Sequence, residues 1–156
     1  TFTRHNFHND EIESQFVLRE PLLFLLPKDH PLAKYERIPV KALNGIDFII
    51  PAAEQSLTLH NTILEFAKTN NIEFNIVQKA DNILFNINSI GMGLGCTILP
   101  GYIAPLTMNN TVIRPLEVEL PSLDLYVSYR KQNSSQAVDK FMELLTRVFY
   151  LDINRN

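Results

Sequence analysis

Residues 48–67, FIIPAAEQSLTLHNTILEFA, decide the fold class. Phe48 to Ile50 is a short apolar run that stops at Pro51, which is typical of a buried strand. Ser56 is a predicted helix N-cap, and after it the spacing becomes helical. The apolar residues then recur at i, i+4, i+7 and i+8 and form one stripe, which consists of Leu59, Ile63, Phe66 and Ala67. The stretch therefore predicts a strand that leads into an amphipathic helix.

The same alternation continues on both sides of this unit. Upstream, residues 13–26 predict a strand whose apolar run Leu22–Leu26 suits burial on both faces, and residues 39–45 predict one helical turn with Gly45 as its left-handed cap. Downstream, the patterns predict a strand at 74–77, a helix capped by Asp81 with Ile83, Ile87 and Ile90 on one face, strands at 96–99, 112–113 and 123–129, and a last helix with Ala137, Phe141, Leu144, Leu145 and Val148 in one stripe. Strands that alternate with helices predict an α/β fold with a largely parallel sheet covered on both faces.

Two segments stand where such a fold binds ligands. In open α/β sheets, ligands settle outside the carboxyl ends of the strands, where helix N-termini point inward. Pro51–Thr58 and Lys79–Asn82 each follow a predicted strand and begin a predicted helix. We therefore expect both segments at the binding edge of the sheet.

Composition excludes several classes of protein. The 156 residues are 46% apolar, so they can bury a core, and the lone Cys96 cannot form an internal disulfide, which favours a reducing cytoplasm. A net charge of −3 argues against a grip on a phosphate backbone by this chain alone. No apolar stretch approaches the roughly 20 residues that cross a bilayer, and the first residues lack the pattern of a signal peptide.

The sequence carries no motif that is typical of an enzyme active site. Gly91-Met92-Gly93-Leu94-Gly95 follows a predicted helix and precedes a strand, which is the reverse of a phosphate-binding loop, so a helix C-cap is the better interpretation. The four histidines suit solvated or structural roles, and no nucleophile elbow, Cys/His arrangement or metal-ligand spacing occurs. We expect no enzyme, no metal and no cofactor.

Two features could hold a small anion. A guanidinium at Arg4 could bind a carboxylate by two parallel hydrogen bonds, although a surface arginine would look the same. Ser56-Leu57-Thr58 combines hydroxyls with the free N–H groups of a helix start, although capping without a ligand would leave the same pattern.

The order of motifs resembles the C-terminal effector-binding domain of LysR-type transcriptional regulators over essentially the whole chain. Residues 20–33, EPLLFLLPKDHPLA, look like the family's strand and its His-Pro-Leu loop. Residues 90–100, IGMGLGCTILP, are similar to its Gly-x-Gly turn and following strand, and Leu125–Tyr129, Arg130 and a terminal helix complete the pattern. Phe2-Thr3-Arg4 resembles most closely the subgroup that senses benzoate- and muconate-type acids.

The resemblance implies two Rossmann-like lobes of the type 2 periplasmic-binding-protein kind, with a small effector between them. Residues 1–18 would end lobe I and cross over, residues 19–122 would form mainly lobe II, and residues 123–156 would return to lobe I. The ligand-binding residues carried over are Arg4, Ser56, Leu57, Thr58, Ala80 and Asp81. A second arginine that the subgroup uses for a buried benzoate is replaced by Leu18, which puts any secondary effector site in doubt.

The resemblance also implies partners and a location. The effector would be an organic acid, and the protein a cytoplasmic bacterial homodimer or tetramer. DNA would be bound only through a winged helix-turn-helix upstream of Thr1, so the sequence is expected to be a fragment with an incomplete first lobe. A solute-binding protein of a transport system shares the fold and is the alternative.

Overall fold

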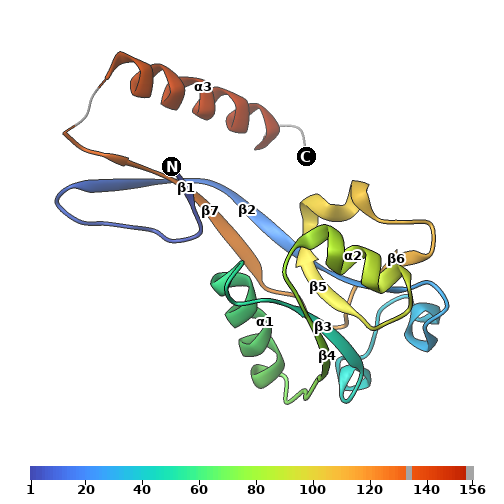
Figure 1. Ribbon diagram of the computed structural model, residues 1–156. Helices are drawn as coiled ribbons and strands as arrows, with labels where there is room; N and C mark the ends of the chain where they lie inside the picture. The colour runs from blue at the N-terminus through green and yellow to red at the C-terminus, as the bar shows by residue number, and fades with distance from the viewer. Residues whose placement is uncertain (133–134, 154–156) are drawn as a thin grey trace. The chain divides into compact units, whose positions relative to one another are not determined.

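The computed structural model describes residues 1–132 and 135–153, which form two compact units (Figure 1). One unit consists of residues 21–122, and the other of residues 1–20 together with the described residues from 123 onward. Strand β2 (Ile12–Pro27) passes from one unit into the other, and strand β7 (Ser122–Arg130) begins at the return.

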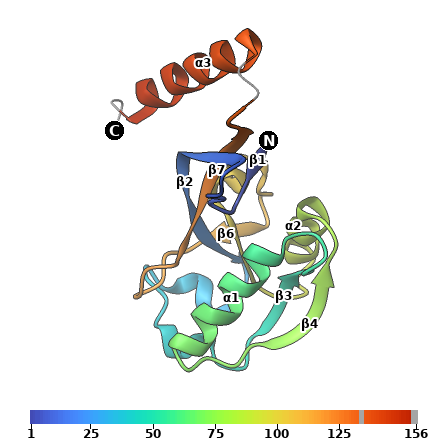
Figure 2. The same ribbon diagram turned by 90° about the vertical axis from the view of Figure 1, so that its left-hand side faces the viewer.

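The unit of residues 21–122 is built around a parallel pair of strands. β3 (Asp47–Pro51) pairs with β4 (Asn75–Ala80), and helix α1 (Leu57–Thr69) connects them. Helix α2 (Ile83–Gly91) then leads to β5 (Thr97–Pro100), which is joined to β3 by a parallel bridge between Phe48 and Cys96. Figures 1 and 2 show α1 and α2 on different sides of these strands, and Phe48, Ile49 and Ile50 are accordingly buried. The predicted α/β architecture and the predicted α1 stripe are confirmed.

The prediction of a largely parallel sheet is wrong for the strands around β2. β2 pairs antiparallel with β5 and, further along, with β6 (Thr111–Ile113). Alternation with helices predicts direction only for strands that a helix connects, which here are β3, β4 and β5. After β5 the chain instead turns through the 3-10 helix η3 (Gly101–Leu106), and β6 reaches β2 from there.

Two short 3-10 helices shape the segment between β2 and β3. In η1 (Pro31–Lys34), the Nδ1 atom of His30 accepts a hydrogen bond of 3.1 Å from the Leu32 backbone, and burial lowers the pKa of His30. η2 (Val40–Leu43) lies inside the predicted helical turn, and Gly45 follows it with a φ of 73°. The left-handed conformation confirms Gly45 as the cap.

Helix α2 begins one residue later than the sequence predicts. Its N-cap is Asn82, whose side chain accepts a hydrogen bond of 2.8 Å from the Phe85 N–H, so the prediction of Asp81 as the cap is wrong. Both side chains can cap a helix, and their order alone does not say which adopts the extended backbone of the N-cap. At the other end Met92 is the C-cap and Gly93 has a φ of 81°, which confirms the predicted turn.

The other unit combines three strand segments with a helix. β1 (Phe2–Thr3) pairs antiparallel with β7, and β7 also adjoins β2, where the Ser14 and Ser128 hydroxyls lie 2.7 Å apart. Helix α3 (Gln136–Ile153) follows, and the ring of Phe141 meets that of Phe2 edge-on at 6.3 Å. The predicted helix is confirmed, but its stripe is not buried, since Phe141, Leu144 and Val148 each keep about half of their surface exposed.

Within residues 1–132 and 135–153, no helix has the length and apolar character needed to span a bilayer.

Candidate functional site

The candidate site in the unit of residues 21–122 starts from the paired carboxyl ends of β3 and β4. Pro51 is the register partner of Ala80, and the Ala52 N–H donates a hydrogen bond of 2.9 Å to the Ala80 carbonyl oxygen. Since α1 begins shortly after Pro51 and α2 shortly after Ala80, two helix starts follow adjacent strand ends. The structure thus brings the predicted segments 56–58 and 80–81 to one end of the same strand pair. Figure 2 shows this pair, β3 and β4, beside α1.

Ser56 holds the N-cap position of α1 without capping it by its side chain. Its backbone N–H donates to the Ala52 carbonyl (3.2 Å), and its own carbonyl accepts from the His60 N–H (3.0 Å). Its φ of −155° and ψ of 86° leave the hydroxyl without a capping bond to the helix. The predicted N-cap position is therefore confirmed, whereas the Ser56 hydroxyl makes no capping bond to α1.

Leu57 and Thr58 form the first turn of α1. Leu57 is 58% exposed although it is apolar, and Thr58 is half-buried. The first N–H groups of a helix have no partner within the helix and carry part of its positive dipole. An exposed apolar side chain next to this helix start suits a ligand with an apolar body and a polar or anionic end.

His60 connects α1 to β3 at the candidate site. The sequence pattern gave no reason to assign His60 to this site. Its Nδ1 lies 2.8 Å from the Pro51 carbonyl oxygen. Because a carbonyl oxygen only accepts, Nδ1 is the donor and carries the proton in this contact. The bond fixes the start of α1 to the end of β3, and a histidine inside an amphipathic helix gives no sequence signal of such a tie.

Ala80 and Asp81 lie at the second strand end of the candidate site, where β4 finishes. Ala80 is buried, and Asp81 is exposed. Because Asn82 caps α2, Asp81 contributes its negative charge near the helix start without a capping bond. That charge favours the α2 dipole but opposes a nearby anion, so an anionic ligand would rely on α1 and on a separate cation.

Arg4 belongs to the other unit, directly after β1. Its Nη1 donates a hydrogen bond of 3.2 Å to the Leu123 carbonyl oxygen, and its side chain is half-buried. A guanidinium has five N–H donors, so this single bond leaves donors for a carboxylate. The structure confirms that Arg4 stands at a strand end, and its contact with a ligand stays a prediction.

Reactive groups are few in the described residues. No group of three or more His, Cys, Asp or Glu side chains is placed to hold a metal ion within residues 1–132 and 135–153. Burial raises the pKa of Cys96 to about 12, so its thiol stays protonated and is a poor nucleophile.

The sequence matches the family model described as "LysR substrate binding domain" over residues 1–149. The chain belongs to this family. The resemblance drawn from the sequence motifs is thereby confirmed at the family level. The LysR domain is 34% identical over 142 residues to the Hca operon transcriptional activator HcaR of Escherichia coli K12, which covers 91% of the chain and 48% of that protein.

A second relative is also a transcriptional regulator by name, and solved structures share the fold. The HTH-type transcriptional regulator AlsR of Bacillus subtilis is 27% identical over 80% of the chain and 41% of its own length. The CcmR regulatory domain of Synechocystis PCC6803, solved in complex with 2-PG, superposes with a TM-score of 0.82 at 19% identity, over 95% of this chain and 72% of that one. The BenM effector-binding domain with its effector benzoate gives 0.79 at 13% identity, over 97% and 69%.

These matches fix the fold of the LysR domain. It is the type 2 periplasmic-binding-protein-like α/β fold that the sequence predicted. The chain spans about half the length of the curated relatives HcaR and AlsR.

Proposed function

We propose that the chain is the effector-sensing part of a LysR-family DNA-binding transcriptional regulator, and that it binds a small carboxylate metabolite without transforming it. The family match over residues 1–149 supports this proposal most directly. HcaR and AlsR are both named as regulators of transcription, which favours this function over the transport alternative.

The proposed effector site combines Arg4 with Ser56, Leu57, Thr58, Ala80 and Asp81. The adjacent strand ends at Pro51 and Ala80 support it, because they bring two of the three segments to one place. Within its own unit Arg4 keeps guanidinium donors beyond its bond to the Leu123 carbonyl oxygen, and Ser56 supplies a hydroxyl that makes no capping bond to α1. A benzoate- or muconate-type acid is the effector class that we propose.

Calorimetric titration of the chain with a panel of aromatic acids and dicarboxylates tests the site. We expect one acid to bind, Arg4→Gln to weaken it about tenfold or more through loss of a charge-assisted hydrogen bond, and Ser56→Ala to weaken it less. Arg130→Gln is a matched control, since Arg130 is an exposed arginine outside the proposed site. An acid that binds equally well to the parent chain and to Arg4→Gln would refute the assignment of Arg4.

We further propose that the protein acts in the bacterial cytoplasm, contacts DNA through a region outside residues 1–156, and is not an enzyme. The net charge of −3 supports the second point, because a phosphate backbone is bound by Lys and Arg side chains. A filter-binding assay tests it, and we expect the chain alone to show no salt-dependent retention of duplex DNA.

Assembly into a homodimer or tetramer is also proposed. β4 exposes Ile76 (41%) and Val77 (45%), and the contacting helix α2 exposes Leu84 (59%) and Phe85 (48%). Exposed apolar side chains on a strand and on a helix that contacts it can serve as an interface. Light scattering with Leu84→Glu tests this surface, and we expect the variant to shift to a smaller species than the parent chain.

A further inference from the structure

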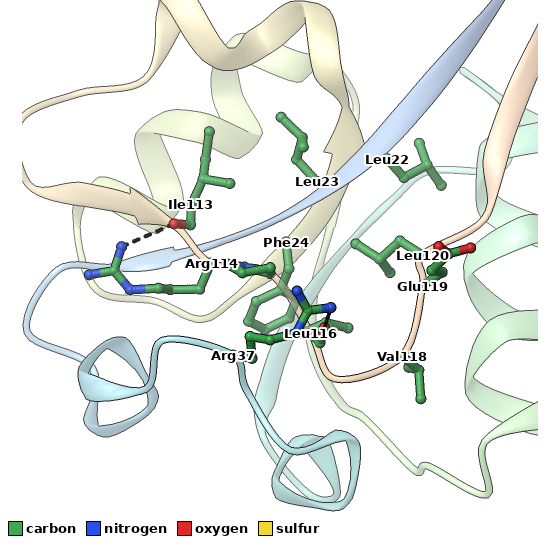
Figure 3. Close-up of a pocket in the computed structure, with 11 residues that line it drawn as sticks. Leu22, Leu23, Phe24, Arg37, Ile113, Arg114, Leu116, Val118, Glu119 and Leu120 are labelled. Carbon is green, nitrogen blue, oxygen red and sulfur yellow. Dashed lines mark hydrogen bonds between the residues drawn. The ribbon is translucent and has the colours of Figure 1, made fainter.

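A pocket separate from the candidate effector site lies beside β2 in the unit of residues 21–122 (Figure 3). Its volume is about 310 Å³, within the lower part of the range for small-molecule sites. The wall is apolar and comes from β2 and the segment 113–120, through Leu22, Leu23, Phe24, Leu116, Val118 and Leu120. Such a wall can bury a small branched or aromatic group.

One guanidinium is positioned at this wall. Arg37 Nη2 donates a hydrogen bond of 2.9 Å to the Leu116 carbonyl oxygen, and the parallel bridge between Ile38 and Leu116 holds the two segments together. Figure 3 shows the Arg37 guanidinium beside Leu116 at the pocket. The bond orients the side chain and leaves its other N–H groups without a partner within the described residues.

The second arginine of the pocket is committed elsewhere. Arg114 donates to the Ala33 carbonyl (3.0 Å) through Nε and to the Ile113 carbonyl (3.2 Å) through Nη1. In Figure 3 its guanidinium lies on the Ile113 side, away from that of Arg37. Arg37 is therefore the cation that faces a ligand in this pocket.

A carboxylate stands at the same pocket without being paired to Arg37. Glu119 lines the pocket, and Figure 3 shows its carboxylate next to Leu120, on a different side from Arg37. No ion pair within 4.0 Å joins Arg37 or Glu119 to any residue of the ranges 1–132 and 135–153. The pocket thus presents a positive and a negative group, not paired with each other, beside one apolar surface.

We propose that this pocket binds a small zwitterion with an apolar side group, of the class of the aliphatic amino acids. Arg37 pairs with its carboxylate, Glu119 pairs with its ammonium, and the leucine-rich wall covers its side group. A simple carboxylic acid would be repelled by Glu119, and a simple amine by Arg37, so only the zwitterion satisfies both charges. The chain would then sense a second ligand in addition to the effector of the proposed function.

Calorimetry of the full chain with three matched probes tests this proposal. The probes are L-leucine, 4-methylpentanoate, which lacks the ammonium group, and 3-methylbutylamine, which lacks the carboxylate. We expect leucine to bind at one site and the other two to bind about tenfold more weakly or not at all. Arg37→Gln and Glu119→Gln should each weaken leucine about tenfold, whereas the controls Lys41→Gln and Glu117→Gln, which change exposed charges outside the pocket, should not.

A loss of leucine binding in these variants can be distinguished from a loss of folding. Both residues are exposed, so Glu119→Gln should keep the thermal unfolding midpoint of the parent chain, and Arg37→Gln, which loses the bond to the Leu116 carbonyl oxygen, should lower it only slightly. Calorimetry is carried out well below both midpoints, so a loss of binding reports on the pocket. Absence of leucine binding overturns the proposal. It is also overturned if 4-methylpentanoate binds as well as leucine, or if Arg4→Gln abolishes leucine binding while Arg37→Gln leaves it intact, because the ligand would then occupy the effector site.

Discussion

Gly95 approaches Asp47 so closely that a Cβ atom on Gly95 would lie 2.8 Å from the Asp47 carbonyl oxygen. That oxygen also accepts a hydrogen bond of 2.8 Å from the Cys96 N–H, and Phe48 forms a parallel bridge with Cys96. The start of β5 can therefore reach the start of β3 only where the residue before Cys96 has no side chain. Gly95 therefore allows β5 to pair with β3 in the core of the unit of residues 21–122.

Substitution of Gly95 by alanine should destabilise the fold by about 1–3 kcal/mol, because the clash is with backbone that cannot rotate away. Urea unfolding followed by circular dichroism measures the change. Leu94→Ala is the matched control, since Leu94 is 46% exposed and should lose much less. If Gly95→Ala and the parent chain had equal free energies of unfolding, β3 and β5 could move apart without a loss of stability, and the proposed role of Gly95 would be wrong.

The N-cap of α2 gives a second prediction. Asn82→Ala removes the hydrogen bond to the Phe85 N–H and should cost about 1 kcal/mol, whereas Asp81→Ala should cost only the smaller charge–dipole term. The same unfolding assay compares the two variants. A larger loss for Asp81→Ala would restore Asp81 as the cap.

How far the sequence predicted the fold depended on the kind of signal. The apolar periodicity of Leu59, Ile63, Phe66 and Ala67 placed α1 and its buried face, because a stripe of this width has one way to face a core. Strand direction around β2 was not predictable, because antiparallel pairing depends on partners that lie far apart in the chain. Asp81 and Asn82 are both good caps, so composition could not choose between them.

The candidate site was predictable only in part. The segments that follow β3 and β4 could be found, since any strand end before a helix start is a candidate in an α/β fold. The tie between His60 and the Pro51 carbonyl could not, because it depends on three-dimensional placement. Arg37 and Glu119 were also missed, since they stand far apart in the chain and each is an ordinary surface residue in the sequence.

Acid should weaken the contact between Arg19 and Asp124. The hydrogen bond of 2.9 Å from Arg19 Nε holds the pKa of Asp124 below its usual range. A carboxyl group with a lowered folded-state pKa stabilises the fold fully above its unfolded value of about 4, and this contribution is lost as pH falls through the folded value. Asp124→Asn should therefore be less stable than the parent chain at neutral pH, and the difference should shrink below about pH 4.

The effect of that pair should be small, because the Arg19 side chain is 67% exposed. Unfolding midpoints measured across the range from neutral to acidic pH test the sign. Arg19→Gln should reproduce the pattern of Asp124→Asn. A difference that grows on acidification would contradict the lowered pKa.

Cys96 should be unreactive in the folded chain. It is fully buried, and burial raises its pKa to about 12, so at mildly alkaline pH almost no thiolate is present or accessible. A chromogenic disulfide reagent should release no colour from the native chain and one equivalent after denaturation. Rapid labelling of the native chain would show that the β3–β5 region opens.

The buried side chains of Asn86 in α2 and Thr97 in β5 should be coupled in their contributions to the free energy of unfolding. Thr97 donates a hydrogen bond of 2.8 Å to the Ile49 carbonyl and accepts one of 3.3 Å from Asn86 Nδ2, while Asn86 Oδ1 has no partner within the described part of the chain. Thr97→Val should cost about 1–3 kcal/mol, since it leaves the Asn86 amide and the Ile49 carbonyl unsatisfied in a dry interior. Asn86→Leu should cost less, because it removes an atom that is already unpaired and leaves the Thr97–Ile49 bond in place.

The double variant then decides whether the amide and the hydroxyl act as a pair. In a chain that already carries Asn86→Leu, the substitution Thr97→Val no longer strands the amide, so the combined loss should be smaller than the sum of the single losses by about 0.5–1.5 kcal/mol. A double-mutant cycle in urea measures this coupling. Simple additivity would mean that the 3.3 Å contact between Asn86 and Thr97 contributes nothing, and that Thr97 stabilises the fold through Ile49 alone.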